Sequence, residues 1–164
     1  MKIWGIVGWK NSGKTGLMER LVAEFTARGL TVSTVKHAHH AFDVDQPGKD
    51  SYRHREAGAQ EVLLTSGRRW ALMHELRGAK EPGLEELLAR LSPVDLVLVE
   101  GFKSESHPKL EAHRSATGQA LIAPGDSTIR AVASDARSGT LDRPVFDLND
   151  TAAIADFIAA ELGL

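Results

Sequence analysis

The chain has 164 residues, of which 42% are apolar, and a net charge of −2 with its seven histidines neutral. This length suits one domain with a hydrophobic core and is short for two. The charge balance gives no overall basic field for nucleic acid. The sequence has no cysteine, which excludes disulfides, thiolate metal sites and cysteine nucleophiles. No apolar run reaches the roughly 18 residues of a membrane helix, and no signal-peptide pattern precedes the first strand. We therefore expect a cytoplasmic protein without a membrane or nucleic-acid partner.

A phosphate-binding loop motif stands near the start of the chain. Residues 2–7 are apolar and partly β-branched, which is typical of a buried strand. Residues 8–15 fit the pattern G-x-x-x-x-G-K-[ST]. Apolar residues then recur at helical spacing on one face, at Leu17, Leu21, Val22 and Phe25. Strand, glycine loop and helix in this order predict a nucleotide site.

The residue types in this loop suit the binding of a triphosphate. Backbone N–H groups at a helix N-terminus attract a phosphate. We expect Lys14 to reach the β- and γ-phosphates, and the Thr15 hydroxyl to hold Mg²⁺. Gly8 and Gly13 allow a sharp turn and a close approach of the backbone. The predicted nucleotide-binding residues of the loop are Gly8, Trp9, Lys10, Asn11, Ser12, Gly13, Lys14 and Thr15.

A polar segment at residues 36–51 follows a predicted strand at residues 31–35. Ligands of open α/β sheets bind at this end of the strands. Two functional interpretations remain open, beside that of a solvated loop. The side chains of His37, His39 and His40 are of a type that binds Zn or Ni. Alternatively, Asp43 or Asp45 faces the Mg²⁺ of the nucleotide, and the basic residues meet an anionic partner.

The apolar run at residues 96–99 is followed by Glu100 and predicts a central buried strand with a carboxylate at its tip. In phosphate-loop proteins such an acid meets Mg²⁺ directly or through water. We therefore assign Glu100 to the metal site and to catalysis. Asp95 precedes the run and is expected at the opposite end of the sheet.

The remaining elements complete an α/β pattern. We expect helices over 51–59 with Asp50 or Ser51 as N-cap, from Pro82 with an apolar stripe to Leu91, and after residues 149–151. Strands are expected over 61–65, 69–76, 129–133 and 144–146, the second antiparallel to the first because the gap between them is too short for a parallel crossover. Residues 109–114 alternate like a short edge strand. Lys103, Lys109 and Arg114 are either phosphate-binding residues or surface charges.

We therefore predict one three-layer α/β domain over residues 1–164, with the fold of the phosphate-loop NTPases. Its sheet is expected to be mostly parallel with an antiparallel extension.

Five segments together resemble the MobB family of molybdopterin-guanine dinucleotide biosynthesis adaptor proteins. They are residues 8–15, 35–40, 45–51, 99–103 and 108–114. The resemblance covers nearly the whole chain, and the His-rich loop with its Pro-Gly-Lys-Asp-Ser sequence is much more specific than the phosphate loop. It implies a homodimer that binds GTP and Mg²⁺ through residues 8–15, with at most slow GTP hydrolysis. The implied partners are molybdopterin and the molybdopterin guanylyltransferase (MobA-type) that attaches GMP to it.

The resemblance also carries site residues over to this chain. Glu100 would be the acid of the second nucleotide motif, and Asp45 a candidate near the metal. The Asn-Lys-x-Asp signature for guanine is absent. Asp135, at a predicted strand end, is the nearest substitute, since its carboxylate can accept hydrogen bonds from guanine N1 and N2.

Two other functions stay open from the residues alone. A small-molecule kinase would need an acid or histidine to take the acceptor proton, and Asp43, Asp45 or His37 would serve. A metallochaperone-type GTPase would use His37, His39 and His40. The sequence offers no obvious residue to orient an attacking water, which fits slow hydrolysis.

Overall fold

The computed structural model describes residues 1–38, 42–136 and 141–164. His39 and His40, two of the candidate metal ligands, lie outside the described residues. The chain divides into two compact units, residues 1–37 with 88–164 and residues 38–87. The expectation of one domain over 1–164 stays a prediction. Within the described ranges, no helix is long and apolar enough to cross a membrane.

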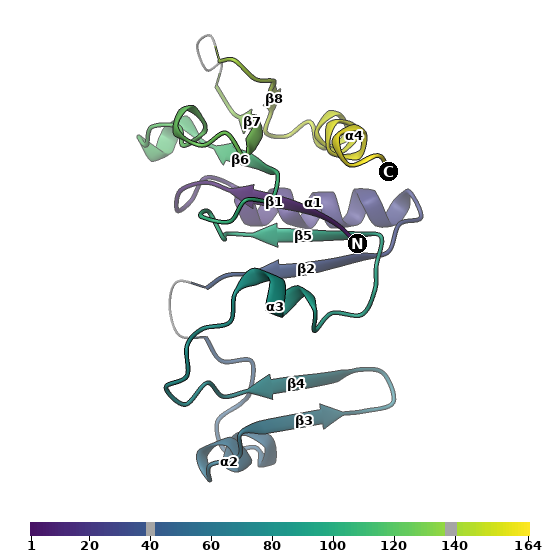
Figure 1. Cartoon of the computed structure of the whole chain (residues 1–164), viewed down its shortest axis with the longest axis vertical. Helices are drawn as coiled ribbons and strands as arrows, with labels where there is room; N and C mark the ends of the chain where they lie inside the picture. Colours follow the sequence, from purple (N-terminus) through teal and green to yellow (C-terminus); the bar gives the residue numbers. More distant parts are fainter. Residues whose placement is uncertain (39–41, 137–140) are drawn as a thin grey trace. The chain divides into compact units, whose positions relative to one another are not determined.

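The first unit is built on a six-stranded sheet with the order β2-β5-β1-β6-β7-β8. Every neighbouring pair in it is parallel, and the arrowheads of β1, β2 and β5 point the same way in Figure 1. The strands are β1 (Lys2–Val7), β2 (Val32–Lys36), β5 (Leu96–Glu100), β6 (Lys109–His113), β7 (Ile129–Ser134) and β8 (Val145–Asp147). The carboxyl ends of β1 and β5 are aligned, since Ile6 pairs with Glu100.

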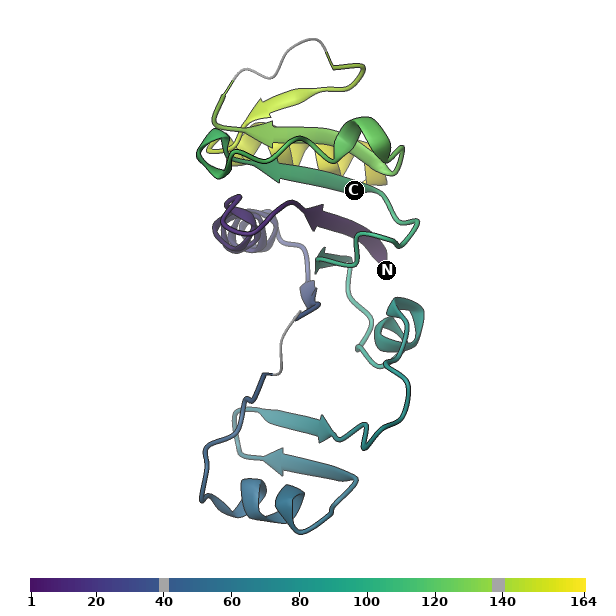
Figure 2. The same cartoon turned by 90° about the vertical axis from the view of Figure 1, so that its left-hand side faces the viewer.

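Helices α1 (Lys14–Ala27) and α4 (Thr151–Leu162) cover one face of this sheet. Seen end-on in Figure 2, α1 lies to one side of β1. Trp4 and Ile6 of β1 pack there with Leu17, Leu21 and Phe25 of α1, and all five side chains are fully buried. The ring of Trp4 also meets Phe157 of α4 edge-on at 6.0 Å. The helical stripe read from the sequence is thus the core face of α1, and Asp150 caps α4 by accepting from the N–H of Ala153.

The opposite face is covered by the segment between β6 and β7, which contains the 3-10 turns η1 (Ser115–Thr117) and η2 (Ala123–Gly125). Ala123 packs there with Val7, Ile129 and Val132. The carboxylate of Glu111 holds this segment in place, because it accepts the N–H groups of Ile122 and Ala123 at 2.8–3.0 Å.

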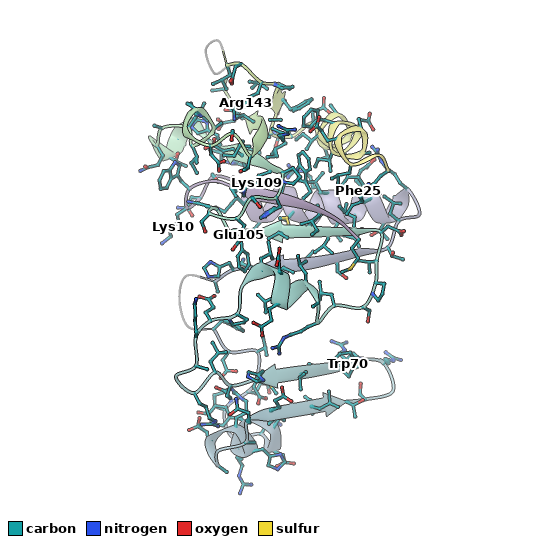
Figure 3. All side chains as sticks on the ribbon, in the orientation of Figure 1. Lys10, Phe25, Trp70, Glu105, Lys109 and Arg143 are labelled. Carbon is teal, nitrogen blue, oxygen red and sulfur yellow. The ribbon has the colours of Figure 1, made fainter. Side chains whose placement is uncertain are left out.

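The expectation of an edge strand at residues 109–114 was wrong, because β6 lies between β1 and β7. Its polar residues Lys109 and Glu111 are fully buried. The Lys109 ammonium donates to the carbonyls of Glu105 and His107 and, at 2.7 Å, to the hydroxyl of Thr128. Figure 3 shows Lys109 and Glu105 close together on the sheet. Lys109 is therefore neither a surface charge nor exposed to a phosphate. In a sequence, buried charged residues whose hydrogen bonds are satisfied give the same alternation of polar and apolar residues as an exposed edge strand.

The ends of β2 and β5 opposite to Glu100 are joined by Asp95. Its Oδ2 accepts from the N–H and hydroxyl of Thr31 at 2.8 and 2.6 Å, and these bonds hold the pKa of the Asp95 carboxyl below its usual value. This confirms the expectation that Asp95 lies away from the phosphate loop.

The second unit contains α2 (Asp50–Glu56), β3 (Glu61–Thr65) and β4 (Trp70–His74). The two strands form an antiparallel pair, as expected, and this pair is a two-stranded sheet of its own. The helix begins one residue earlier than predicted, with Lys49 at the N-cap, and ends before Gly58, whose φ is 108°. A short helix, α3 (Leu84–Leu88), bridges the boundary of the two units in sequence and ends three residues before the predicted stripe does.

Candidate functional site

The loop between β1 and α1 has the backbone that its glycines predict. Gly8, Asn11 and Gly13 have φ values of 148°, 64° and 93°, a region that L side chains rarely adopt. The loop turns back on itself, since the N–H of Ser12 donates to the carbonyl of Trp9 at 3.3 Å. Gly13 is the N-cap of α1, so the positive end of this 14-residue helix opens onto the loop.

Both motif glycines are also required by close packing. A Cβ on Gly8 would lie 2.3 Å from the carbonyl oxygen of Ala112. A Cβ on Gly13 would lie 2.9 Å from Nε of Arg114 and 3.1 Å from Leu148. The Arg114 guanidinium therefore lies directly over the backbone at the start of α1.

A cavity of about 350 Å³ lies against this loop, and we call it the phosphate cavity. It is lined by Asn11, Ser12, Gly13, Lys14, Thr15, Gly16 and Arg114. Ser12 is 1% exposed, and its hydroxyl has no hydrogen-bond partner among the described residues. A buried polar atom without a partner is costly, so this hydroxyl is suited to bonding with a polar ligand.

Lys14 is folded along the loop. Its ammonium donates to the carbonyl of Trp9 at 2.6 Å. Burial lowers the pKa of Lys14; the carboxylate of Glu100 opposes this shift, whereas the charges of Lys103 and Lys36 add to it. Three lysines and one glutamate thus act on one another at this edge of the sheet, and the local potential is positive.

Glu100 lies at the carboxyl end of β5, where the sequence placed it. Its side chain is 12% exposed, and Oε1 is 3.6 Å from the ammonium of Lys36 at the end of β2. With Thr15 it offers one carboxylate and one hydroxyl. This donor set fits Mg²⁺, which takes one or two protein oxygens and completes its shell with phosphate and water.

Asp135 follows β7 and faces the segment after β6. Its Oδ1 accepts the N–H of Ser115 at 2.8 Å. This bond, a hydrogen bond from the Ser115 side chain and the charge of Arg114 hold the pKa of the Asp135 carboxyl below its usual value. Asp135 and Arg114 are therefore neighbours, and Arg114 joins the phosphate cavity to the end of β7.

Asp43 and Asp45 belong to the second unit, where both are bound to Arg55. The guanidinium donates to both oxygens of Asp43 at 2.9 and 3.0 Å and approaches Asp45 at 3.4 Å. Asp45 also accepts from the hydroxyl of Ser51 at 2.8 Å, and its side chain is only 6% exposed. These contacts give Asp45 a structural role within its unit, and its role near Mg²⁺ stays a prediction.

His37 belongs to the first unit, where its N–H donates to the carbonyl of Glu100 at 3.0 Å and its ring lies 4.8 Å from that of Phe102. The described residues contain no group of three or more His, Cys, Asp or Glu side chains that would hold a metal ion.

One part of the site was missed from the sequence. A second cavity of about 480 Å³, which we call the Trp9 cavity, is lined by Trp9, Lys10, Asn11, Ala116, Thr117 and Gln119. Its far wall comes from the segment after β6, which lacks any motif. The Pro124-Gly125 pair is a turn signal in this segment, and it does not indicate a cavity.

A parallel sheet with this loop between its central strand and the first helix defines an α/β protein of the phosphate-loop class. The chain matches over residues 3–135 the family described as "MobB: Molybdopterin guanine dinucleotide synthesis protein B". It therefore belongs to the MobB family, as the resemblance indicated.

Individual relatives agree with this assignment. The chain is 42% identical to the molybdopterin-guanine dinucleotide biosynthesis adapter protein of Escherichia coli K12, over 92% of this chain and 87% of the relative. It is 43% identical to the adapter protein of the same description in Haemophilus influenzae, over 94% and 85%. The crystal structure of a MobB homolog from Bacillus stearothermophilus superposes with a TM-score of 0.73, at 33% identity and 99% coverage of both chains. These relatives favour the adapter over the kinase and metallochaperone alternatives.

Proposed function

We propose that this protein is a GTP-binding adapter in the biosynthesis of molybdopterin guanine dinucleotide. Its relatives carry the adapter description, and the phosphate cavity supports the nucleotide. The single observation that carries the proposal is the convergence on this cavity of the α1 N-terminus, two cations (Lys14 and Arg114) and the buried Ser12 hydroxyl, which has no partner in the part of the chain that the structure describes.

The helix N-terminus, Lys14 and Arg114 suit different parts of a triphosphate. Backbone N–H groups and the positive helix end favour a bound phosphate. Lys14 would stabilise charge on the β- and γ-phosphates. Arg114 lies over Gly13 and lines the phosphate cavity together with Thr15 and Gly16, so we assign its planar guanidinium to the α- and β-phosphates.

Mg²⁺ would be held by Thr15 and by Glu100, directly or through water, and would offset the charge of the terminal phosphates. Glu100 is also the partner of Lys36 at 3.6 Å, so metal binding would compete with this ion pair. We assign no described side chain to the orientation of an attacking water, and we expect at most slow GTP hydrolysis.

Selection of guanine is assigned to Asp135. A carboxylate that accepts from guanine N1 and N2 uses both oxygens, and Oδ1 already accepts one N–H from Ser115. Each carboxylate oxygen has two lone pairs, so this oxygen can accept a second donor without losing the first.

The test is calorimetric titration of GTP and of ATP, each with and without Mg²⁺, into the wild type, Lys14→Ala and Lys2→Ala. Lys2 is an exposed lysine at the opposite end of β1 and serves as the matched control. We expect GTP binding that Mg²⁺ strengthens, a loss of about 10- to 100-fold in Lys14→Ala for one or two charge-assisted hydrogen bonds, and no change in Lys2→Ala. Equal affinities in all three proteins would refute the phosphate site.

The proposal includes three partners: molybdopterin, the guanylyltransferase that receives the nucleotide, and a second copy of this chain. The homodimer is supported by the second unit. Among its described residues, only Val62 and Leu84 are buried apolar side chains, while Leu63, Leu64, Trp70 and Leu72 of the β3–β4 hairpin are 47–66% exposed. A two-stranded ribbon with this little core requires cover, and its open edges can pair with the same strands of a second copy around a two-fold axis.

A further inference from the structure

The Trp9 cavity is distinct from the phosphate cavity and shares only Asn11 with it. Its volume of about 480 Å³ is in the range of small-molecule sites, which is about 300–1,000 Å³. The phosphate loop supplies one wall, and the segment after β6 supplies the other. Figure 3 shows Lys10 beyond the carboxyl ends of the sheet's strands.

The position of Lys14 indicates which end of a bound nucleotide adjoins this cavity. The Lys14 ammonium lies 2.6 Å from the carbonyl of Trp9, and in phosphate loops this lysine serves the β- and γ-phosphates. The Trp9 side is therefore the terminal-phosphate side. The base is expected at Asp135, whose carboxylate accepts the N–H of Ser115. Ser115 directly precedes Ala116 and Thr117 of the Trp9 cavity. We place the base at Asp135 itself and leave the adjoining Trp9 cavity to a second ligand.

The Trp9 indole is held in a fixed orientation. Its Nε1–H donates to the carbonyl of Ala120 at 2.8 Å, and the Lys103 ammonium lies 4.4 Å from the ring centroid. The side chain is nevertheless 39% exposed. An indole whose polar atom is satisfied and whose surface lines a cavity is suited to stacking against a flat heteroaromatic ring.

The polar groups around the indole define the rest of the ligand. Asn11 and Gln119, two residues with side-chain amides, line the cavity. Each amide offers a donor and an acceptor, which matches the 2-amino-4-oxo edge shared by pterins and guanine. Lys10 lines the cavity and Lys103 lies over the indole, and these two cations favour a ligand with an anionic group.

From this arrangement we infer that the Trp9 cavity binds a phosphate-bearing pterin beside the terminal phosphates of the nucleotide. The inference rests on the proposed function, because it assumes that GTP occupies the phosphate cavity. It gives the adapter a physical role: the pterin and the nucleotide are held on one protein, on the two sides of the same loop.

The test uses the full chain saturated with GTP and Mg²⁺, into which 6-hydroxymethylpterin phosphate is titrated in a calorimeter. GMP in place of the pterin separates the two sources of the 2-amino-4-oxo edge. The variants are Gln119→Leu and Trp9→Ala, with Trp70→Ala as the matched control, since Trp70 is also an exposed tryptophan. A GTP titration of each protein, run first, sets the saturating concentration, and thermal unfolding shows that each variant is folded.

We expect one pterin site in the presence of GTP, at least tenfold weaker binding in Gln119→Leu and Trp9→Ala, and unchanged binding in Trp70→Ala. GMP should bind the saturated protein at least tenfold more weakly than the pterin. Competition between pterin and GTP, equal or tighter binding of GMP, or equal pterin affinities in all variants would overturn the inference. GTP binding without pterin binding overturns this inference alone, whereas the absence of GTP binding overturns the proposed function.

Discussion

The ammonium of Lys14 lies 2.6 Å from the carbonyl oxygen of Trp9, five residues earlier in the same loop. The Lys14 ammonium therefore donates to a backbone carbonyl of its own loop, and burial lowers the pKa of this lysine. A phosphate that entered the loop would give the ammonium an anionic partner in place of a carbonyl. This exchange makes the protonation of Lys14 part of the binding equilibrium.

The first prediction concerns proton uptake on GTP binding. The pKa of Lys14 is depressed in the free protein, so above that pKa the amine is partly neutral, and binding of a polyanion raises the pKa again. GTP binding should then take up protons at alkaline pH and weaken as the pH rises. Calorimetry at a series of alkaline pH values, in two buffers of different ionisation enthalpy at each, measures this uptake. It should disappear in Lys14→Met, and the same uptake in that variant would contradict the assignment.

The second prediction concerns Gly8. Its φ of 148° and the 2.3 Å that would separate an added Cβ from the carbonyl oxygen of Ala112 leave no room for alanine. Gly8→Ala should destabilise the protein by about 2–4 kcal/mol, from backbone strain of about 1–3 kcal/mol and the added clash. Gly163→Ala, at a φ of 65° with open space around it, should cost about 1 kcal/mol. Urea denaturation compares the two, and equal losses would contradict this account.

These glycines also show how far the sequence could be interpreted. The eight-residue motif, the Leu17 stripe and the apolar run before Glu100 are local patterns, so they predicted the loop, α1 and β5 correctly. The place of β6 was not predictable, because the hydrogen-bond partners of Lys109 lie 2 to 19 residues away and those of Glu111 lie 11 to 12 residues away, mostly in loops without a motif. Without those partners, a buried lysine and glutamate on a strand are indistinguishable from an exposed edge. The far wall of the Trp9 cavity was hidden for the same reason.

The third prediction concerns acid stability and His107. Both ring nitrogens are buried without a hydrogen-bond partner among the described residues. A Cβ on Gly5 of β1 would lie 2.5 Å from Nε2. Burial, reinforced by the charge of Lys109 and opposed by Asp126, lowers the pKa of His107 to about 4.

Because the unfolded chain binds this proton more readily, the contribution of His107 to stability is complete above pH ~6.5 and is lost as the pH falls towards 4. The loss should approach about 3 kcal/mol. It should be reduced in His107→Gln, which has no group that titrates there, and retained in His54→Gln. Urea denaturation from pH 7 to pH 4 measures it. A His107→Gln profile parallel to that of the wild type would show that another group is responsible.

The fourth prediction concerns base selection by Asp135. If the carboxylate accepts from N1 and N2 of guanine, Asp135→Asn replaces one acceptor by a donor. GTP affinity should fall by about 10- to 100-fold, since a hydrogen bond to a charged group contributes about 1.5–3 kcal/mol. The affinity of the variant for xanthosine triphosphate, which carries an oxygen in place of the 2-amino group, should rise relative to its affinity for GTP.

Calorimetry with GTP, xanthosine triphosphate and ATP tests this order of affinities. ATP affinity serves as the control for the phosphate cavity and should not change, and equal losses for all three nucleotides would assign Asp135 to loop structure.

The fifth prediction concerns the β3–β4 hairpin. Leu63 and Leu72 are cross-strand partners. Trp70, which is labelled in Figure 3, lies on the same strand as Leu72. These side chains are 47–66% exposed, and their burial between two copies would contribute about 25 cal/mol for each Å² of apolar surface removed from water.

Light scattering at micromolar concentration should give twice the chain mass for the wild type. The double variant Leu63→Glu and Leu72→Glu should give a single chain, because a dimer interface would have to bury four unpaired carboxylates. Glu19→Gln on the exposed side of α1 is the control and should stay dimeric. A wild type with the mass of a single chain would contradict the homodimer. A double variant that keeps the dimer mass would place the interface outside the hairpin. A dimer that dissociates only when the hairpin is charged ties self-association to the β3–β4 hairpin.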